Sequence, residues 1–270
     1  MRKILISSTL GFFATLAAPA YAQDDAGELE QWQRDIDVAA EPLRGRDWHG
    51  FVGAGVVAAQ RAHGDERAIV LPLASISYKD TAYWRTAGGG VWLFTDDQRR
   101  ARIGIAGKFR RGYDPDDDAA LAGMSERDTA FELGVNARFA VQAIRVSAAY
   151  YGDVTGTTDG ESAILSIAHA LRAGPRLRLA PSVRAEWLDA DVVDYYYGVR
   201  AYEATAARPA YAGKNTVNLR AGVSGGYAVT RRWSLFAGVS HTWLGAGIAD
   251  SPIVVNDEVT ALYLGGGWRF

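Results

Sequence analysis

Apolar and polar residues alternate with a period of two along most of this chain. In 131–139, for example, Phe131, Leu133 and Val135 share one parity and Glu132 falls on the other. Successive side chains of a β-strand point to opposite faces of the sheet, so this alternation predicts strands with one apolar and one polar face. About eleven segments follow the pattern, and they cover 48–59, 67–79, 81–95, 98–110, 131–139, 144–150, 160–172, 176–187, 217–227, 233–243 and 259–270.

The length of these segments favours a membrane-spanning sheet over a soluble one. Strands of a soluble β-sandwich usually have about 5–6 residues. Here the alternation often persists for the ~9–11 residues that cross a bilayer at a tilt of ~45°. Trp233 and Trp243 share one face and, at that tilt, lie about 24 Å apart along the membrane normal. This spacing fits the ~25 Å apolar band between two aromatic girdles. A sandwich with both tryptophans in its core is the alternative.

The connections between the segments alternate in length, from short ones such as 229–232 to long ones such as 111–126. Short periplasmic turns and long outer loops are typical of outer-membrane barrels, which have an even number of strands when they come from one bacterial chain. A twelfth strand would arise from division of 81–95 at its glycines 88–90, or from 191–199. We therefore predict an all-β fold, a transmembrane antiparallel up-and-down β-barrel of about 12 strands (roughly 10–14).

The N-terminus carries the features of an exported protein. Arg2 and Lys3 precede an apolar run, and the segment 20–22 (Ala-Tyr-Ala) fits a signal-peptidase site. We predict a signal peptide over 1–22, a polar periplasmic segment over 23–46 and an outer-membrane barrel over 47–270. A membrane anchor is the alternative for the apolar run, but the run is shorter than the ~20 residues of a spanning helix.

Composition narrows the function further. The chain contains no cysteine, so its stability has to come from packing or from a closed sheet rather than from disulfides. The formal net charge is −2, and loss of Arg2 and Lys3 with the signal peptide lowers it by two, to −4. This acidic balance gives no reason to expect nucleic-acid binding.

The C-terminal run 259–270 ends on an aromatic residue, Phe270, with Trp268 and Leu264 on the same parity. A terminal aromatic strand of this kind resembles the signal that the barrel assembly machinery reads, and closure of the last strand leaves no edge unpaired in lipid. We expect the outer membrane of a Gram-negative bacterium as the location and its lipid as the surroundings of the apolar face. The aromatic residues expected at the membrane interfaces are Trp187, Trp233, Trp243, Trp268 and Phe270.

The opposite parity of the strands would line the lumen, and its charge is mostly basic. The candidate lumen-lining residues are Arg100, Arg102, Lys108, Arg138, Arg145, Arg176, Arg178, Arg184, Arg220, Glu132 and Glu186. One interpretation is a pore that favours anions, because rings of Arg and Lys select anions. The other is structural: the arginines pair with Glu132, Glu186 and backbone carbonyls and fill a narrow barrel.

No pattern of catalytic residues is present. The four histidines occur without a metalloprotease or nucleophile-elbow motif, so we predict neither an enzyme nor a cofactor or metal site. The Asp-rich stretch 114–118 has the ligand type of Ca²⁺ but lacks EF-hand spacing, which favours a solvated loop. The tyrosines at 195–197 suggest an interfacial aromatic belt, with a packing or partner surface as the alternative.

Several short motifs, taken in order, resemble the MipA/OmpV family of outer-membrane proteins. They are Leu71-Pro72-Leu73 with Ile76 and Tyr78, Arg111 with Leu121, Gly123 and Met124, Tyr196-Tyr197-Gly198-Val199, Asp250-Ser251-Pro252-Ile253, and Gly267-Trp268-Arg269-Phe270. The resemblance covers about 48–270. Trp268 stands where the family more often has Tyr, and the loop 111–126 is unusually rich in Asp.

The resemblance implies an outer-membrane barrel without catalytic residues. Name-giving members of the family are described as scaffolds that link a lytic transglycosylase to a murein synthase, and others as porin-like or adhesin-like. We therefore expect a scaffold or adaptor for peptidoglycan-remodelling enzymes, with 23–46 as a docking element. The alternative is a small porin-like channel with a basic lumen that favours anions.

Overall fold

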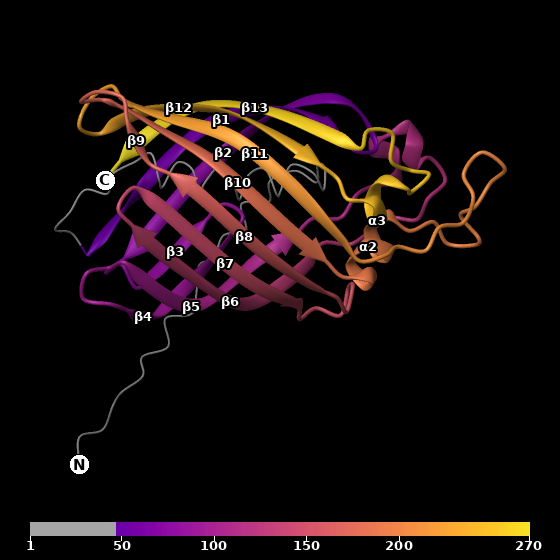
Figure 1. Cartoon of the computed structure of the whole chain (residues 1–270). Helices are drawn as coiled ribbons and strands as arrows, with labels where there is room; N and C mark the ends of the chain where they lie inside the picture. The colour runs from indigo at the N-terminus through magenta and orange to yellow at the C-terminus, as the bar shows by residue number, and fades with distance from the viewer. Residues whose placement is uncertain (1–46) are drawn as a thin grey trace, which may run out of the picture.

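The computed structural model describes residues 47–270, and within them antiparallel strands close into a barrel of twelve strands. The predicted signal peptide and the polar segment 23–46 lie outside the described residues. Figure 1 shows the strands running obliquely around the barrel axis.

Thirteen strand segments make up the sheet. Their bounds are β1 Trp48–Arg61, β2 Gly64–Tyr78, β3 Ala82–Arg85, β4 Gly88–Thr95, β5 Ala101–Arg110, β6 Ala130–Val141, β7 Ile144–Asp153, β8 Glu161–His169, β9 Leu171–Arg172, β10 Leu177–Leu188, β11 Thr216–Ala228, β12 Trp233–Trp243 and β13 Glu258–Arg269. Both β8 and β9 pair with β10 and are separated by one residue, so they form a single strand of the barrel.

The barrel closes where its first and last strands meet. β1 and β13 pair antiparallel, and the amides of Gly50 and Phe270 each donate to the other residue's carbonyl at 3.1 Å. Every strand thereby has a neighbour on each side, as a lipid environment requires. That the assembly machinery reads Phe270 stays a prediction.

The prediction of an all-β barrel of about 12 strands is confirmed. The sequence offered two sources for the twelfth strand. The first, division of 81–95 into two strands, is confirmed, because this segment forms the β3–β4 hairpin. The other candidate, 191–199, is mostly helix α2, Ala190–Tyr197.

The two parities of the strands have different surroundings. In β13, Leu262 and Leu264 are 54% and 63% exposed on the outward face, whereas Tyr263 between them is only 7% exposed. The interface candidates lie near the two ends of the strands: Trp187 and Trp243 at one end, and Trp233, Trp268 and Phe270 at the other. Their role at the membrane interface stays a prediction.

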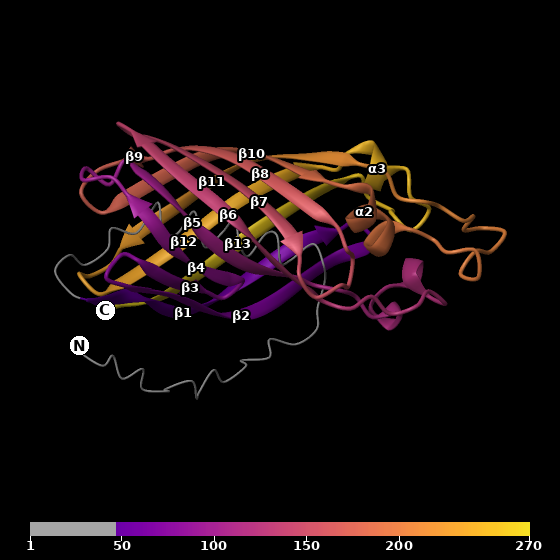
Figure 2. The same cartoon turned by 90° about the horizontal axis from the view of Figure 1, so that it is seen from below.

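The two ends of the barrel are built differently. Turns of a few residues join the strands at the end that holds Phe270, which we call the turn end. Long connections lie at the opposite end, the loop end, and include α2, α3 (Ala246–Ala249) and the 3₁₀ turns η1 (Pro115–Asp117) and η2 (Ala119–Leu121). Figures 1 and 2 both place α2 and α3 at the far end of the barrel from the C-terminus. Within 47–270, no helix is long and apolar enough to cross a membrane.

The loop end carries two apolar cores that together we call the cap. One contains Ala62 of the β1–β2 turn, Leu188, Ile248 of α3 and the buried face of α2. The other joins Tyr113, Leu121, Met124, Val199 and Ile253 from three separate loops. The cap therefore ties together connections that are far apart in sequence.

Helix α2 explains why 195–197 do not form an interfacial belt. The Asp189 carboxylate caps the helix by accepting from the amide of Val192 at 2.9 Å. Val192, Val193, Tyr196 and Tyr197 then fall on one helical face and are buried in the cap. The belt interpretation was wrong for Tyr196 and Tyr197, and the alternative, a packing surface, is what the structure contains.

Candidate functional site: the barrel lumen and its cap

The inward face of the strands holds most of the predicted lumen residues. Those on inward positions are Arg102, Lys108, Glu132, Arg138, Arg145, Arg178, Arg184, Glu186 and Arg220. Arg145 is exposed near the turn end. Arg100 and Arg176 instead lie exposed in turns, where the alternation of faces no longer applies.

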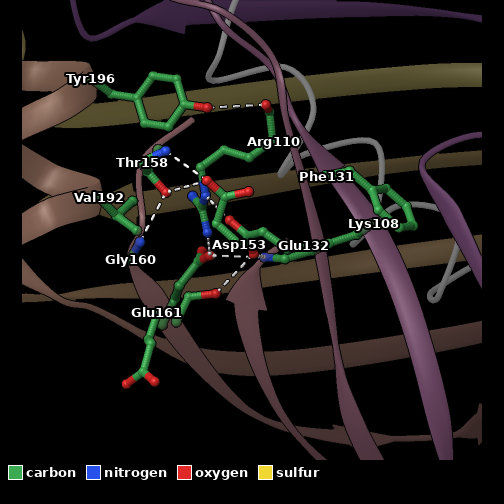
Figure 3. A network of polar contacts seen from close by, with 12 residues as sticks. Lys108, Arg110, Phe131, Glu132, Asp153, Thr158, Gly160, Glu161, Val192 and Tyr196 are labelled. Carbon is green, nitrogen blue, oxygen red and sulfur yellow. Dashed lines mark hydrogen bonds and ion pairs between the residues drawn. The ribbon is translucent and has the colours of Figure 1, made fainter. Parts of the chain in front are cut away.

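A network of buried ion pairs crosses the lumen just below the cap (Figure 3). Lys108 Nζ lies 3.1 Å from Glu132 Oε2 and 3.8 Å from Glu186 Oε1. Arg110 pairs with Glu132 and, at 3.4 Å, with Glu186. β5 and β10, which carry these cations and Glu186, are separated in the sheet by β6, β7 and β8, so the network bridges the interior rather than following the wall.

Further contacts complete the network. The hydroxyl of Ser162 donates to Glu132 Oε2 at 3.0 Å, and Arg184 Nη2 donates to Glu186 Oε2 at 3.1 Å. Ion pairs buried this deeply retain their charge only when their remaining hydrogen-bonding capacity is met. In this part of the lumen, the geometry agrees with the interpretation in which inward arginines pair with Glu132 and Glu186 rather than line an open pore.

The cap rests directly on this network. The Tyr196 hydroxyl lies 3.2 Å from the carbonyl oxygens of Arg110 and Asp128, to which it donates. Figure 3 shows Tyr196 reaching from α2 to Arg110. Burial raises the pKa of Tyr196 well above its usual range, so the phenol remains a donor at physiological pH.

The cap is held by a buried ion pair between two loops. Arg127 and Glu203 are 2% and 3% exposed, and two hydrogen bonds of 3.0 Å join the guanidinium to both carboxylate oxygens. Arg127 Nε also donates to the carbonyl of Tyr195 at 2.6 Å. Burial raises the pKa of Glu203, but hydrogen bonds from Arg127 and from the amides of Arg200 and Ser125 outweigh it and hold the pKa at about 2.

The inner wall of β12, β13, β1 and β2 carries an apolar cluster. It includes Phe51, Leu71, Leu73, Phe236 and Tyr263. Phe51 and Phe236 meet edge to face at 5.3 Å although β13 lies between their strands. We call this cluster the apolar wall.

The inner wall of β3 to β8 carries both polar and apolar side chains and surrounds a small cavity that is partly open to solvent. Three basic residues line it, Arg85, Lys108 and Arg138, and none of its described lining residues is acidic. Arg85 and Arg138 lie over the Tyr83 ring at 4.6 and 6.0 Å, which fixes their direction.

Two buried polar atoms of this cavity have no hydrogen-bond partner among residues 47–270: Asn136 Oδ1 and Ser166 Oγ. The Asn136 amide donates instead to the Tyr83 hydroxyl at 2.7 Å. Buried polar groups are normally satisfied, so these two atoms mark unused binding capacity. Periodicity places Asn136 and Arg138 on one face, but it does not identify Tyr83 and Ser166 as their neighbours.

Within 47–270, no group of three or more His, Asp or Glu side chains is arranged to hold a metal ion. Asp118 of the Asp-rich loop pairs with Arg61 rather than facing solvent. His63 is buried in the cap, where its Nδ1 lies 3.0 Å from the carbonyl of Ile253.

The sequence matches the model of the family described as MltA-interacting protein MipA over residues 52–270, nearly the whole barrel. The chain belongs to the MipA family. The resemblance noted from its short motifs is thereby confirmed, and so is its place in the outer membrane, because MipA-family relatives are named outer membrane proteins. The loop end accordingly faces outward and the turn end faces the periplasm.

Individual relatives differ in how much they share with this MipA-family chain. Outer membrane protein Omp26La of Vibrio anguillarum is 30% identical over 53% of this chain and 55% of its own length, so the chain spans about half of that relative. The MltA-interacting protein of Escherichia coli K12 is 23% identical over 81% of this chain and 89% of its own length. A solved Pseudomonas aeruginosa FadL homologue aligns with a TM-score of 0.45 at 10% identity, over 83% of this chain and 90% of that chain. None of these names denotes an enzyme.

Proposed function

We propose that this MipA-family barrel is a non-enzymatic scaffold or adaptor that holds peptidoglycan-remodelling enzymes at the periplasmic face of the outer membrane. The observation that carries the proposal is the double closure of the lumen, by the cap and by the ion-pair network beneath it. A barrel whose outer end carries a cap and an ion-pair network across its lumen is better suited to presenting a surface than to passing solutes.

The name of the Escherichia coli relative supports the choice of partner. That protein is named for its interaction with MltA, and it aligns over 89% of its length. We extend this partner class to the present chain: a periplasmic lytic transglycosylase, with a murein synthase as the second enzyme of the assembly.

The turn end offers a surface for such a partner. Arg172 and Arg176 flank one turn and Arg231 and Arg232 lie in the next, and all four side chains are exposed. The amide of Ala228 donates to the carbonyl of Arg176 at 2.9 Å, which fixes the two turns side by side. Neither turn contains an acidic residue. This basic surface attracts an acidic partner by charge complementarity.

The experiment measures binding of the refolded full chain to the purified lytic transglycosylase of the same bacterium by surface plasmon resonance. Substitution of Arg172, Arg176 and Arg231 by Glu should weaken binding by about tenfold or more, because charge reversal at a complementary surface costs at least ~1.4 kcal/mol. The matched control is D65K/E66K at the outer end, which should leave binding unchanged. Absence of measurable binding by the unaltered chain would remove the scaffold proposal.

The rival function is a small porin-like channel that favours anions. Basic residues on inward positions support it, including Arg138 and Arg178 nearer the turn end. The ion-pair network across the lumen supports it less, because ions would have to displace the paired charges. A single-channel conductance measurement separates the two functions, since only a channel passes ions through the unaltered barrel.

A further inference from the structure

The periplasmic mouth of the barrel lies where the described chain begins. Among residues 47–270, the strand connections at the turn end contain only a few residues, too few to fold over the mouth. β1 starts here, and the amide of Lys79 in the β2–β3 turn donates to the carbonyl of Asp47 at 2.6 Å. This bond holds Asp47 at the rim, so the predicted periplasmic segment 23–46 joins the barrel beside its mouth.

The inward surface near this mouth concentrates arginines. Arg102 of β5 and Arg138 of β6 face the lumen and are directly opposite each other in the strand register. Arg178 of β10 and Arg172 of β9 form a second opposed pair. Like charges at opposed positions of neighbouring strands repel. All acidic residues within the described strands lie at the level of the ion-pair network or nearer the loop end, so these strands supply no carboxylate near the mouth.

Ring contacts orient the arginines of β5 and β6 without neutralising them. Arg138 lies over the Trp92 ring at 5.3 Å, and Arg102 lies over the same ring at 5.9 Å. An aromatic ring attracts a cation through its quadrupole but contributes no net negative charge. Each guanidinium has five N–H donors, so several contacts can coexist with a bound carboxylate. We call the inward face formed by Trp92, Arg102 and Arg138 the arginine wall.

Unused hydrogen-bonding capacity lies next to the arginine wall. Asn136 is two residues before Arg138 on the same face of β6, and its buried Oδ1 has no partner within 47–270. Ser166 Oγ of the same cavity is the second such atom. The amide oxygen only accepts, whereas the hydroxyl can donate and accept. A partner that fits this surface therefore brings negative charge and N–H donors together, as a peptide with acidic side chains does.

We propose that segment 23–46 docks on the arginine wall, inside the periplasmic half of the lumen. The segment contains seven acidic and three basic residues, so its charge is opposite to that of the wall. The ten residues from Asp47 back to Asp37 can span up to about 33 Å. The five strand spacings from β1 to β6 amount to about 24 Å along the wall. The carboxylates of Asp35 and Asp37 therefore reach Arg102 and Arg138 and pair with them.

The first test measures how accessible the segment is. The chain contains no cysteine, so one introduced thiol reports on one position. A39C places the thiol in the segment, and A173C places it in an exposed turn at the same mouth. Each chain is purified from outer membranes in neutral detergent and labelled with maleimide-polyethylene glycol, and its rate is divided by that of the urea-unfolded chain. At 0.1 M salt, A39C should label about tenfold more slowly than A173C or slower still.

Salt tests the electrostatic part of the contact on the unaltered wall. Between 0.1 M and 1 M salt the Debye length falls from about 10 Å to about 3 Å, so attraction between the segment and the arginines weakens. The labelling rate of A39C should then rise to within about twofold of A173C.

The second test uses paired variants in the A39C chain. R102E/R138E reverses the charge of the arginine wall and should remove the protection of the thiol. R100E/R176E reverses two exposed arginines of turns at the same mouth and is the matched control, which should keep the protection. Adding D35R/D37R to R102E/R138E makes the charges complementary again and should restore most of the protection.

The outcomes are distinct. Equal labelling of A39C and A173C at 0.1 M salt would overturn the docking. Protection that persists in R102E/R138E and in 1 M salt would overturn the arginine wall as its site, and protection that is lost on dilution would place the segment on a second copy of the chain. Loss of the heat-dependent shift in gel mobility identifies variants that do not fold, and the salt comparison does not depend on them. Docking requires no enzyme partner, so its failure and that of the scaffold function are separate results.

Discussion

At the scale of single residues, Arg127 is the side chain on which the cap depends most. Replacement by Met would leave Glu203 as a buried unpaired carboxylate and would also remove the donor to the Tyr195 carbonyl. Breaking one partner of a buried ion pair costs about 3–5 kcal/mol. We expect R127M to fold as a barrel with an open cap, which limited proteolysis within 189–215 would detect as faster cleavage.

Two controls accompany this variant. R200M removes an exposed arginine of the loop that carries Glu203 and should change cleavage little, because exposed substitutions usually stay within about 0.5 kcal/mol. The double variant R127M/E203M removes both charges and should recover part of the protection, since an apolar pair can replace a buried ion pair. Equal cleavage of R127M and R200M would show that the ion pair does not hold the cap.

The same ion pair makes the cap sensitive to acid. The pKa of Glu203 is about 2 in the folded protein, below the value of an unfolded chain, so its contribution to stability is complete near neutral pH. That contribution should be lost progressively as the pH falls from about 5 to about 2. The protection factors of the cap amides, which correct exchange for its intrinsic pH dependence, should fall over this interval in the unaltered chain and show no such fall in R127M/E203M. A flat profile in the unaltered chain contradicts the assignment.

Sequence reasoning could not have found this pair. Arg127 and Glu203 lie in loops without periodicity, 76 positions apart, and nothing local marks either as buried. By contrast, the inward positions of Lys108, Glu132 and Glu186 follow from alternation alone, because a strand assigns faces strictly by parity. Their mutual pairing across the lumen depends on barrel curvature, which parity does not encode.

At the scale of elements, α2 shows how a capping residue fixes a loop. Asp189 accepts from Val192 N at 2.9 Å and from Glu161 N at 2.7 Å, so it joins the helix start to β8. D189A should cost about 1–2 kcal/mol, typical of a lost N-cap, and should speed hydrogen exchange over 190–197. D191A, an exposed residue of the first turn, is the matched control and should have less than half this effect. Equal exchange in both variants would contradict the capping role.

The strands were predictable because alternation that persists over ten or more residues is rarely found outside a β-strand. The glycines 88–90 correctly suggested a break in 81–95, since Gly interrupts a strand without a side chain to pack. Helix α2 was missed because its apolar positions cluster within one short segment and resemble an aromatic girdle. Its N-cap, Asp189, was the available signal, because Asp before an apolar run is typical of a helix start.

At the scale of the whole molecule, the cap and the ion-pair network act as two closures in series. The cap spans the outer mouth, whereas the network joins β5 and β6 to β10 beneath it. Removing either one leaves the other in place. Loss of the cap alone should therefore expose protease sites without opening a path for ions.

Single-channel recording in a planar bilayer tests this arrangement. The unaltered chain and R127M should both be silent. Addition of E132Q and E186Q to R127M leaves Lys108, Arg110 and Arg184 without their carboxylates, and repulsion among these cations should open the lumen intermittently. The reversal potential in a salt gradient should then favour anions, because the constriction carries only positive charge. Gel mobility of the unheated protein identifies variants that fail to fold. Discrete steps from the unaltered chain would show an open lumen and would favour the channel over the scaffold, since a through-path cannot coexist with both closures.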